Sequence, residues 1–309
     1  MLTLVTGGAG FIGSHLVDGV LAAGHAVRVL DDFTTGRMAN LAHLTGEIEI
    51  VRGDIRDPAA LAAACAGVET IFHEAAIPSV EVSVSHPARV MSANFDGTML
   101  LLEAARAAGS RRVVFASSSA VYGSGGEMPR REALRPRPES PYAASKLAGE
   151  HLLDAWRASY GLETVALRYF NVFGPRQDPE SPYAMAPALI ARAIRDGRTF
   201  TVNGDGEQTR DFTPVANVVA ANLLVAAAPA ADGGVYNVGT GVETSVNAAL
   251  ATMMAIAGRS IPVAHRPGTP WDVRRSCADI SAIAALGYRV IQDFPAGCRA
   301  VLDEALGAE

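Results

Sequence analysis

Apolar and polar positions follow two alternating rhythms along the first 170 residues. Short runs rich in β-branched residues predict strands, and longer Ala- and Leu-rich runs with a polar face predict helices. The expected strands are 2–6, 26–31, 47–54, 70–75, 111–118 and 163–170, and the expected helices are 11–24, 58–65, 88–108 and 141–160. Such alternation is typical of a parallel sheet with helices on both faces. The pattern therefore predicts an α/β fold with a doubly wound parallel sheet.

The rhythm changes after residue 170. Proline, glycine and charged residues become frequent, as in the stretch NVFGPRQDPESPYAMAP, although helical patterns continue. The expected helices there are 185–196, 215–228, 245–257 and 294–305. We expect residues 1–170 to form one domain, with later returns near 214–240, and residues 171–309 to form mainly a smaller, interleaved C-terminal region.

Composition and charge narrow the classes of protein that this chain can be. It has 309 residues, of which 49% are hydrophobic and 19% charged, and its net charge is −6. A mildly acidic globular chain has no overall field that attracts nucleic acid or an anionic membrane. No charge-free apolar run reaches the ~18 residues of a membrane span, and the first apolar run has no basic leader. We therefore expect a cytoplasmic protein without nucleic-acid or membrane partners.

The chain has three cysteines, Cys65, Cys277 and Cys298. They are widely separated and odd in number, so their spacing predicts neither a disulfide framework nor a metal site. We expect them to be buried as small apolar residues, and we expect no metal.

A glycine-rich turn joins the first expected strand to the first expected helix. In VTGGAGFIGSH, Gly7, Gly10 and Gly13 allow a tight turn, close approach of backbone N–H groups to a pyrophosphate, and close helix–strand packing. A plain strand–turn–helix is the alternative interpretation. The second strand ends at Asp31, where a carboxylate accepts from both ribose hydroxyls and repels a 2′-phosphate. The pattern therefore predicts a Rossmann-type site for NAD rather than NADP.

Two further segments follow expected strands. Asp54, in GDIRD at the end of the third strand, either meets the adenine amino group or caps a helix N-terminus, and the sequence favours neither. The segment HEAAIPS follows the fourth strand, so we expect it at the carboxyl edge of the sheet, where open α/β sheets bind ligands.

Tyr142 and Lys146 lie four residues apart in SPYAASKLAGEHLLDAW, on one face of an expected helix. An ammonium held there lowers the pKa of the phenol from ~10 toward the working pH, and such a tyrosine takes a proton from a sugar hydroxyl. The bare pair is common, and surface packing is the alternative. The pair gains weight from FASSSAVYG, where an expected strand runs into three serines whose hydroxyls can bond the same substrate oxygen.

Taken together, these motifs resemble an extended short-chain dehydrogenase/reductase and, within it, the UDP-hexose 4-epimerases. The resemblance covers nearly the whole chain. It rests on TGGAGFIGSH, Asp31, GDIRD, SSSAVYG, PYAASK, RYFNVFGPRQDP, GDGEQTRDFTPV and YNVGTG. It implies an NAD-binding domain over 1–170 and a mainly nucleotide-sugar-binding region over 171–309.

The resemblance also implies a role for individual positions. Tyr142 is implied to be the acid/base, Lys146 to bind the nicotinamide ribose and tune the tyrosine, and Ser118 to bond the reacting 4-hydroxyl. The implied NAD-binding positions are Gly7, Gly10, Phe11, Ile12, Gly13, Asp31, Asp32, Asp54, Ile55, Ala75, Asn94, Tyr142, Lys146 and Phe170. Besides Ser118, Asn171 and Arg210 are implied to hold the diphosphate of the substrate, and Val202, in the loop 200–204, to contact uracil. The remaining implied substrate positions are Arg266 and Asp272 at the nucleotide and Ser276 at the sugar.

The residues after the catalytic hydroxyl favour one reaction. Related 4,6-dehydratases carry Asp-Glu there and related decarboxylases a Glu, whereas Ser119 and Ala120 follow Ser118 here. What remains is oxidation at C4 and return of the hydride to the other face, with NAD kept bound. The alternatives are another NAD-dependent nucleotide-sugar enzyme, such as a UDP-glucuronate 4-epimerase, and a catalytically silent NAD-binding regulatory protein. The intact Ser, Tyr and Lys set argues against the last.

Two departures from the family pattern concern the sugar end. The family has a short RxGD turn, but here RPGTPWDVRRS separates Arg266 from Asp272 by extra residues. By alignment Ser276 takes the position that limits sugar size, and a small residue there predicts that N-acetylhexosamine substrates are accepted besides glucose and galactose.

The expected helices at 88–108 and 141–160 carry many alanines and leucines. Such a stripe either belongs to the core or, as the resemblance implies, pairs across a two-fold axis into a four-helix bundle. We expect a homodimer.

Overall fold

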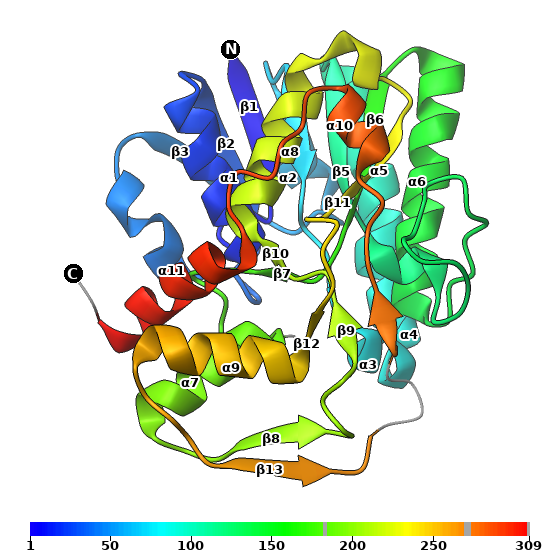
Figure 1. The fold of residues 1–309 in the computed structure, drawn as a ribbon. Coiled ribbons are helices and arrows are strands. Elements are labelled where there is room, and N and C mark those ends of the chain that lie inside the picture. Colours follow the sequence, from blue (N-terminus) through cyan, green and yellow to red (C-terminus); the bar gives the residue numbers. More distant parts are fainter. Residues whose placement is uncertain (182–183, 269–272, 308–309) are drawn as a thin grey trace.

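The computed structural model describes residues 1–181, 184–268 and 273–307. Within them, seven parallel strands form the main sheet, in the order β3-β2-β1-β4-β5-β6-β11 (Figure 1). The strands are β1 (Leu2–Thr6), β2 (Ala26–Asp31), β3 (Ile48–Arg52), β4 (Thr70–His73), β5 (Arg112–Ser118), β6 (Glu163–Tyr169) and β11 (Val235–Val238). The order reverses between β1 and β4, and a ligand crevice is typical of that point. The predicted doubly wound sheet is confirmed.

Helices cover both faces of this sheet. The helices and turns of this part are α1 (Phe11–Ala22), η1 (Met38–Leu44), α2 (Pro58–Cys65), α3 (Val80–Ser85), α4 (Pro87–Met91), the π-helical turn η2 (Ser92–Asp96), α5 (Gly97–Ala108), η3 (Ser119–Tyr122), α6 (Pro141–Tyr160), α8 (Val215–Ala227), η4 (Pro229–Ala231) and α10 (Ser281–Ala285). Helices α1 and α8 pack on one face, and α2, α5 and α6 on the other (Figure 1). The expected helix 88–108 is therefore interrupted by a π turn, a feature frequent at functional sites.

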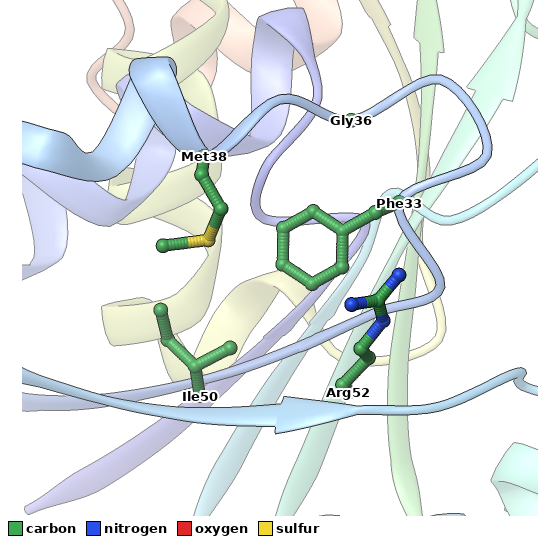
Figure 2. A pocket seen from close by; sticks show the side chains of 5 residues that line it. All are labelled: Phe33, Gly36, Met38, Ile50 and Arg52. Carbon is green, nitrogen blue, oxygen red and sulfur yellow. The ribbon is translucent and has the colours of Figure 1, made fainter.

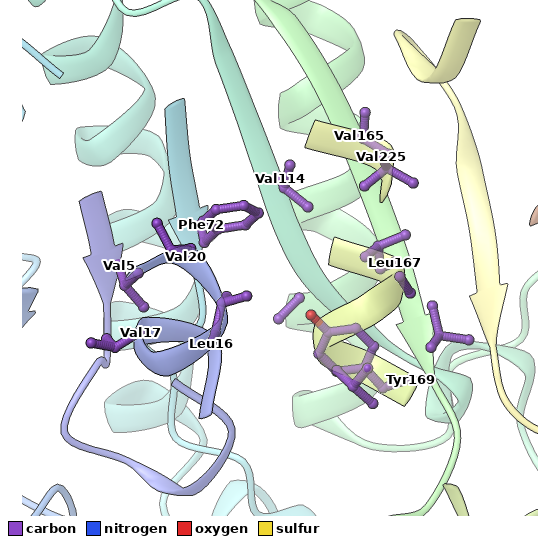
Figure 3. Packing of buried hydrophobic residues seen from close by; sticks show 14 of the residues in the cluster. Val5, Leu16, Val17, Val20, Phe72, Val114, Val165, Leu167, Tyr169 and Val225 are labelled. Atoms are coloured by element: carbon purple, nitrogen blue, oxygen red, sulfur yellow. The ribbon is translucent and has the colours of Figure 1, made fainter. Parts of the chain in front are cut away.

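Buried apolar side chains explain why the two layers stay together. On the α1 and α8 face, Val5, Phe72 and Val114 pack against Leu16 of α1 and Val225 of α8 (Figure 3). Each of these five side chains is at most 2% exposed. Because full burial of one such side chain contributes about 1.5–3 kcal/mol, this cluster fixes the glycine-rich turn against the sheet.

A second group of elements lies below the carboxyl edge of the sheet (Figure 1). Helices α7 (Ala186–Asp196), α9 (Val246–Ala257) and α11 (Phe294–Leu306) share a separate core. The short strands of this part are β7 (Val172–Phe173), β8 (Phe200–Asn203), β9 (Thr209–Arg210), β10 (Thr213–Pro214), β12 (Thr244–Ser245), β13 (Val263–Arg266) and β14 (Arg275–Ser276). Strand β9 lies between β12 and β14, β8 pairs with β13, and β7 pairs with β10.

The chain passes more than once between the two groups. After β7 and α7 it returns to the main sheet with α8 and β11, and α10 packs beside β11. Segment 200–204, expected as a loop, begins with strand β8, which pairs in parallel with β13.

All three cysteines are buried and form no disulfide, as expected. Among the described residues, no helix is both long and apolar enough to cross a membrane.

Candidate active site

The glycine-rich turn makes a narrow cradle at the start of α1. Gly7 has a φ of +68°, and a Cβ on it would lie 2.8 Å from the backbone nitrogen of Ala75. A Cβ on Gly13 would lie 2.1 Å from the carbonyl oxygen of Gly7. Gly10 caps α1 without a side-chain hydrogen bond, so the first N–H groups of the helix remain available to an anion. The cradle therefore fits a dinucleotide pyrophosphate.

Asp31 ends β2 beside this cradle. Its carboxylate accepts hydrogen bonds from the backbone N–H of Ala9 at 2.9 Å and of Phe33 at 2.8 Å. Burial raises the pKa of Asp31, and the two backbone hydrogen bonds act in the opposite direction. Each carboxylate oxygen has a second acceptor site, so Asp31 still fits ribose hydroxyls while it shapes the loop. Asp32 is exposed and caps the N–H of Thr34.

The two interpretations of Asp54 can now be separated. Helix α2 is capped by Asp57, which accepts from the N–H of Ala59 at 2.9 Å. Asp54 instead pairs with the guanidinium of Arg56, and this hydrogen bond lowers the pKa of Asp54. Asp54 is thus not the helix cap, and it stays at the sheet edge where we predict the adenine.

A pocket opens next to Asp31, between the 33–38 segment and the edge strand β3 (Figure 2). The residues that line it are Phe33, Gly36, Met38, Ile50 and Arg52. The guanidinium of Arg52 lies 5.4 Å from the ring centre of Phe33. None of the predicted catalytic or substrate residues lines this pocket, so it does not mark the site of the chemistry.

The side chains of several predicted cofactor residues make contacts within the protein. The amide of Asn94, in the π turn, accepts from the N–H of Ile77 at 2.8 Å and donates to Ser145 at 3.0 Å. It therefore ties the loop after β4 to α6. Phe170 is 0% exposed and packs near Tyr122, which leaves its surface to the core rather than to a ligand. Phe11, Ile12 and Ala75 are half-buried at the cradle, whereas Ile55 is buried on the other face of the sheet, in the core shared with α2 and α5.

The structure brings the predicted catalytic side chains together at the carboxyl end of β5. Helix α6 begins with Ser140 as its cap, which accepts from the N–H of Ala143 at 3.1 Å and places Tyr142 in the first turn. Tyr142 hydrogen-bonds Ser118, the last residue of β5. One turn along α6, Lys146 is 4% exposed and its Nζ donates to the carbonyl oxygen of Ala116 at 2.8 Å.

The predicted lowering of the tyrosine pKa is wrong for the chain by itself. Burial raises the pKa of Tyr142, the hydrogen bond with Ser118 lowers it, and the charge of Glu74 raises it. The ammonium of Lys146 is directed at the Ala116 carbonyl rather than at the phenol. Burial also lowers the pKa of Lys146 to about 8, against the influence of Glu74. Desolvation therefore outweighs the attraction that the four-residue spacing suggested.

The sugar-end predictions fall into two groups. Asn171 donates to the carbonyl oxygen of Asp211 at 3.2 Å and lies 3.5 Å from the hydroxyl of Ser276. Ser276 on β14 pairs with Arg210 on β9, whose guanidinium donates to the carbonyl oxygen of Thr209 at 2.9 Å. These three predicted residues, Asn171, Arg210 and Ser276, therefore lie close together.

The other sugar-end predictions lie elsewhere. Val202 is 1% exposed, and its side chain packs in the core of the lower group of elements, so the prediction holds at most for its backbone. Arg266 lies on β13, exposed, and bonds the side chain of Asn203 on the adjoining β8. Asp272 lies outside the described residues.

Two acidic residues near the site escaped prediction. Asp211 is 0% exposed and accepts from the N–H groups of Thr240, Gly241 and Ala278. Asp211 therefore fixes the loop 240–241 next to Arg210.

Glu74 directly follows β4 and accepts from the hydroxyl of Tyr169 at 2.7 Å. The available signal was a carboxylate within an otherwise apolar strand end, TIFHEAA.

Comparison with known proteins identifies the family. Residues 3–239 match the family described as the NAD dependent epimerase/dehydratase family. The chain belongs to this family. The resemblance deduced from the motifs is thereby confirmed.

Within this family, the chain is similar to several 4-epimerases of UDP-sugars. A UDP-glucose 4-epimerase of Mycolicibacterium smegmatis is 44% identical over 284 residues, which cover 90% of each chain. The solved structure of the Thermus thermophilus UDP-glucose 4-epimerase in complex with NAD superposes with a TM-score of 0.91, at 38% identity and full coverage of both chains. A UDP-N-acetylglucosamine 4-epimerase of Methanobrevibacter ruminantium has a TM-score of 0.94 at 37% identity, covering 99% of this chain and 98% of that one.

Proposed function

We propose that this chain is an NAD-dependent UDP-hexose 4-epimerase. One observation carries the proposal: Ser118, Tyr142 and Lys146 converge at the carboxyl end of β5, at the same sheet edge as a cradle that fits a dinucleotide. No carboxylate follows Ser118 in the sequence to move a second proton. The residues that directly follow Ser118, Ser119 and Ala120, therefore favour epimerisation over dehydration or decarboxylation.

The residues that hold the cofactor follow from the cradle. The N-terminus of α1 and the backbone of Gly7 and Gly10 hold the pyrophosphate, and the carboxylate of Asp31 holds the adenosine ribose. NAD, when bound, would supply the acceptor and then the donor of the C4 hydride, which is the chemistry that inversion at that carbon requires. The negative charge of Asp31 disfavours a 2′-phosphate at the ribose, so NAD is preferred over NADP.

The side chains of α6 and β5 then manage the proton of the 4-hydroxyl. Ser118 hydrogen-bonds the sugar oxygen, and Tyr142 in its phenolate form takes up the proton and later gives it back. Because burial raises the pKa of Tyr142, this phenolate would depend on the positive charge that bound NAD brings to the site. Lys146 has a pKa of about 8 and is therefore protonated at lower pH. It binds the nicotinamide ribose and keeps its hydrogen bond to the Ala116 carbonyl oxygen. Lys146 is buried and Ser118 and Tyr142 are half-buried, which limits exchange of the proton with water during one cycle.

We assign the sugar nucleotide to the neighbouring short strands. Asn171 and Arg210 bind the diphosphate, for which the planar guanidinium is well suited. The 200–204 segment binds uracil, and Arg266 approaches the nucleotide from β13. The small side chain of Ser276 leaves room for an N-acetyl group, so both UDP-glucose/UDP-galactose and their N-acetyl counterparts are substrates.

We also propose a cytoplasmic homodimer formed through α5 and α6. These helices lie side by side at one flank of the molecule (Figure 1). They carry half-buried apolar side chains, among them Met99 and Leu100 on α5 and Leu152 and Trp156 on α6. Packing against a second copy would cover them in a four-helix bundle. A monomeric mass at micromolar concentration would refute this assembly.

The experiment that tests the function uses three substrates. Purified protein is incubated separately with UDP-glucose, UDP-GlcNAc and UDP-glucuronate, first without added NAD, and the products are separated by chromatography. We expect the 4-epimers of the first two sugars. Conversion of UDP-glucuronate alone would assign the chain to the alternative epimerase, and no conversion of any sugar even with added NAD would overturn the proposal.

A further inference from the structure

Glu74 is held in a fixed position from three directions. Its backbone N–H donates to the carbonyl oxygen of Thr6 on β1 at 3.2 Å. Its carboxylate accepts from the hydroxyl of Tyr169 on β6 at 2.7 Å, and the same hydroxyl accepts from Asn222 on α8 at 2.8 Å. The ring of Tyr169 belongs to the apolar cluster under α1 and α8 (Figure 3). These bonds hold the half-buried Glu74 in one position at the sheet edge.

Strand register places Glu74 at the level of the residue that anchors Lys146. Strands β4 and β5 pair His73 with Phe115, so Glu74 lies level with Ala116, whose carbonyl oxygen accepts from Lys146. On the other side of β5, Ser118 pairs with Tyr169. The Glu74–Tyr169 hydrogen bond therefore spans the end of β5 between the anchor of Lys146 and the serine that contacts Tyr142.

The other titratable groups around Glu74 are uncharged near neutral pH. Burial and the nearby Lys146 lower the pKa of His73 on β4 to about 3. Burial and the charge of Glu74 raise the pKa of Tyr169 on β6 well above its ordinary value. The groups in this part of the site that change charge near neutral pH are therefore Glu74 and Lys146.

We propose that Glu74 is a positioning residue whose negative charge sets the pH range of catalysis by holding protons on Lys146 and Tyr142. This inference rests on the proposed roles of Tyr142 and Lys146. A carboxylate next to an ammonium stabilises the ammonium, and next to a phenol it disfavours the phenolate. Removal of the charge therefore makes both side chains lose their protons at lower pH.

The effect has a defined pH window. Burial raises the pKa of Glu74 to about 7, while the Tyr169 hydrogen bond and Lys146 act in the opposite direction. Glu74 is therefore fully charged only at pH values above about 7, close to the pKa of about 8 at which Lys146 loses its proton. The alkaline limit of activity, set by Lys146, depends on Glu74 more strongly than the acid limit does.

The test compares pH profiles of kcat/KM for the wild type and Glu74→Gln on UDP-glucose. We expect the alkaline limit of the variant to move down by about one pH unit, the lower end of the usual effect of a neighbouring charge. Glu69→Gln is the matched control, because Glu69 precedes the same strand at its far end and pairs with Arg111 on the surface. Its profile stays that of the wild type.

A direct readout separates charge from packing. The ultraviolet difference titration of the Tyr142 phenolate, measured against Tyr142→Phe, is expected to shift to lower pH in Glu74→Gln. A folded Glu74→Gln enzyme with unchanged alkaline limit and unchanged phenolate titration overturns the inference, even if its kcat is lower. In that case the wild type still epimerises UDP-glucose, whereas an inactive wild type refutes the proposed function instead.

Tyr169→Phe provides a second variant in case Glu74→Gln does not fold. Loss of the hydroxyl raises the pKa of Glu74, since the hydrogen bond from Tyr169 lowers it. Glu74 then carries less charge at a given pH, and the alkaline limit moves in the same direction by a smaller amount. An unshifted limit in folded Tyr169→Phe would contradict the inference.

Discussion

The cofactor end and the sugar end of the site are built in different ways. At the cofactor end, Asp31 accepts from Phe33, two residues away, and from Ala9, 22 residues away. At the sugar end, residues 209–210, 244–245 and 275–276 form adjoining strands of two residues each. Asn171 and Ser276 meet there across 105 residues of sequence.

The difference teaches how the fold separates stability from specificity. The cradle is packed into the main sheet, so its geometry depends on the core. The sugar end is assembled from exposed or half-buried segments that join the core through few backbone bonds, such as Asp211 N–H to the Ser276 carbonyl oxygen at 2.7 Å. Substitutions at the two ends should therefore fail in distinguishable ways.

The largest effect is expected where the two ends meet. Tyr142→Phe removes the proton acceptor, and loss of acid/base catalysis costs about 10²–10⁴-fold in kcat. Turnover of UDP-glucose measures it, while NAD content and melting temperature stay unchanged. Tyr160→Phe, at the exposed far end of the same helix, is the control and retains full activity. Retention of activity by Tyr142→Phe would contradict the assigned role.

At the cofactor end, Gly13→Ala is expected to disrupt binding and stability together. The new Cβ would lie 2.1 Å from the Gly7 carbonyl oxygen, so α1 must move away from the cradle. Overpacking of this kind costs about 1–3 kcal/mol, and NAD content should fall about tenfold or more. NAD released by denaturation and the melting temperature measure the two effects. Gly125→Ala, with open space around it, is the control.

At the sugar end, Arg210→Met is expected to weaken substrate binding while the cofactor stays. Hydrogen bonds to charged groups contribute about 1.5–3 kcal/mol, so KM for UDP-glucose should rise about 10- to 100-fold. NAD content and melting temperature should match the wild type. Arg198→Met, on a largely exposed arginine, is the control. An equal loss of NAD in Arg210→Met would show that the two ends are not separable.

The smallest effect concerns the sugar pocket itself. Ser276→Tyr fills the space assigned to the N-acetyl group, so the ratio of kcat/KM for UDP-GlcNAc to that for UDP-glucose should fall about 10-fold or more. Ser276→Ala keeps the space and should keep the ratio. Failure of the wild type to accept UDP-GlcNAc, together with good activity on UDP-glucose, would refute the assignment of Ser276.

The parts of the site that could be predicted share one property, which is local spacing. The glycine turn, Asp31 and the Tyr142–Lys146 pair each depend on spacing along one or two elements, and the structure places them as such spacing requires. The strands of the main sheet were predictable because burial on both faces gives continuous apolar runs. Two-residue strands such as β9 and β14 leave no such pattern.

The remaining differences between expectation and structure arise from burial, which spacing does not reveal. Phe170 and Val202 lie at positions that the family resemblance assigns to ligands, yet their side chains are packed in cores. The pKa of Tyr142 was expected to fall, but desolvation raises it. The role of Glu74 depends on Tyr169, which lies 95 residues away in the sequence. Each of these facts requires the tertiary structure.

The central claim is that C4 of the sugar is oxidised and that its own hydride returns. UDP-glucose deuterated at C4 is incubated with the wild-type enzyme in ordinary water, and the UDP-galactose formed is analysed by mass spectrometry and NMR. We predict that the deuterium remains at C4 of the product and that Tyr142→Phe forms this product at least about 100-fold more slowly. Loss of the deuterium to solvent, or its migration to another carbon of the sugar, would contradict the account.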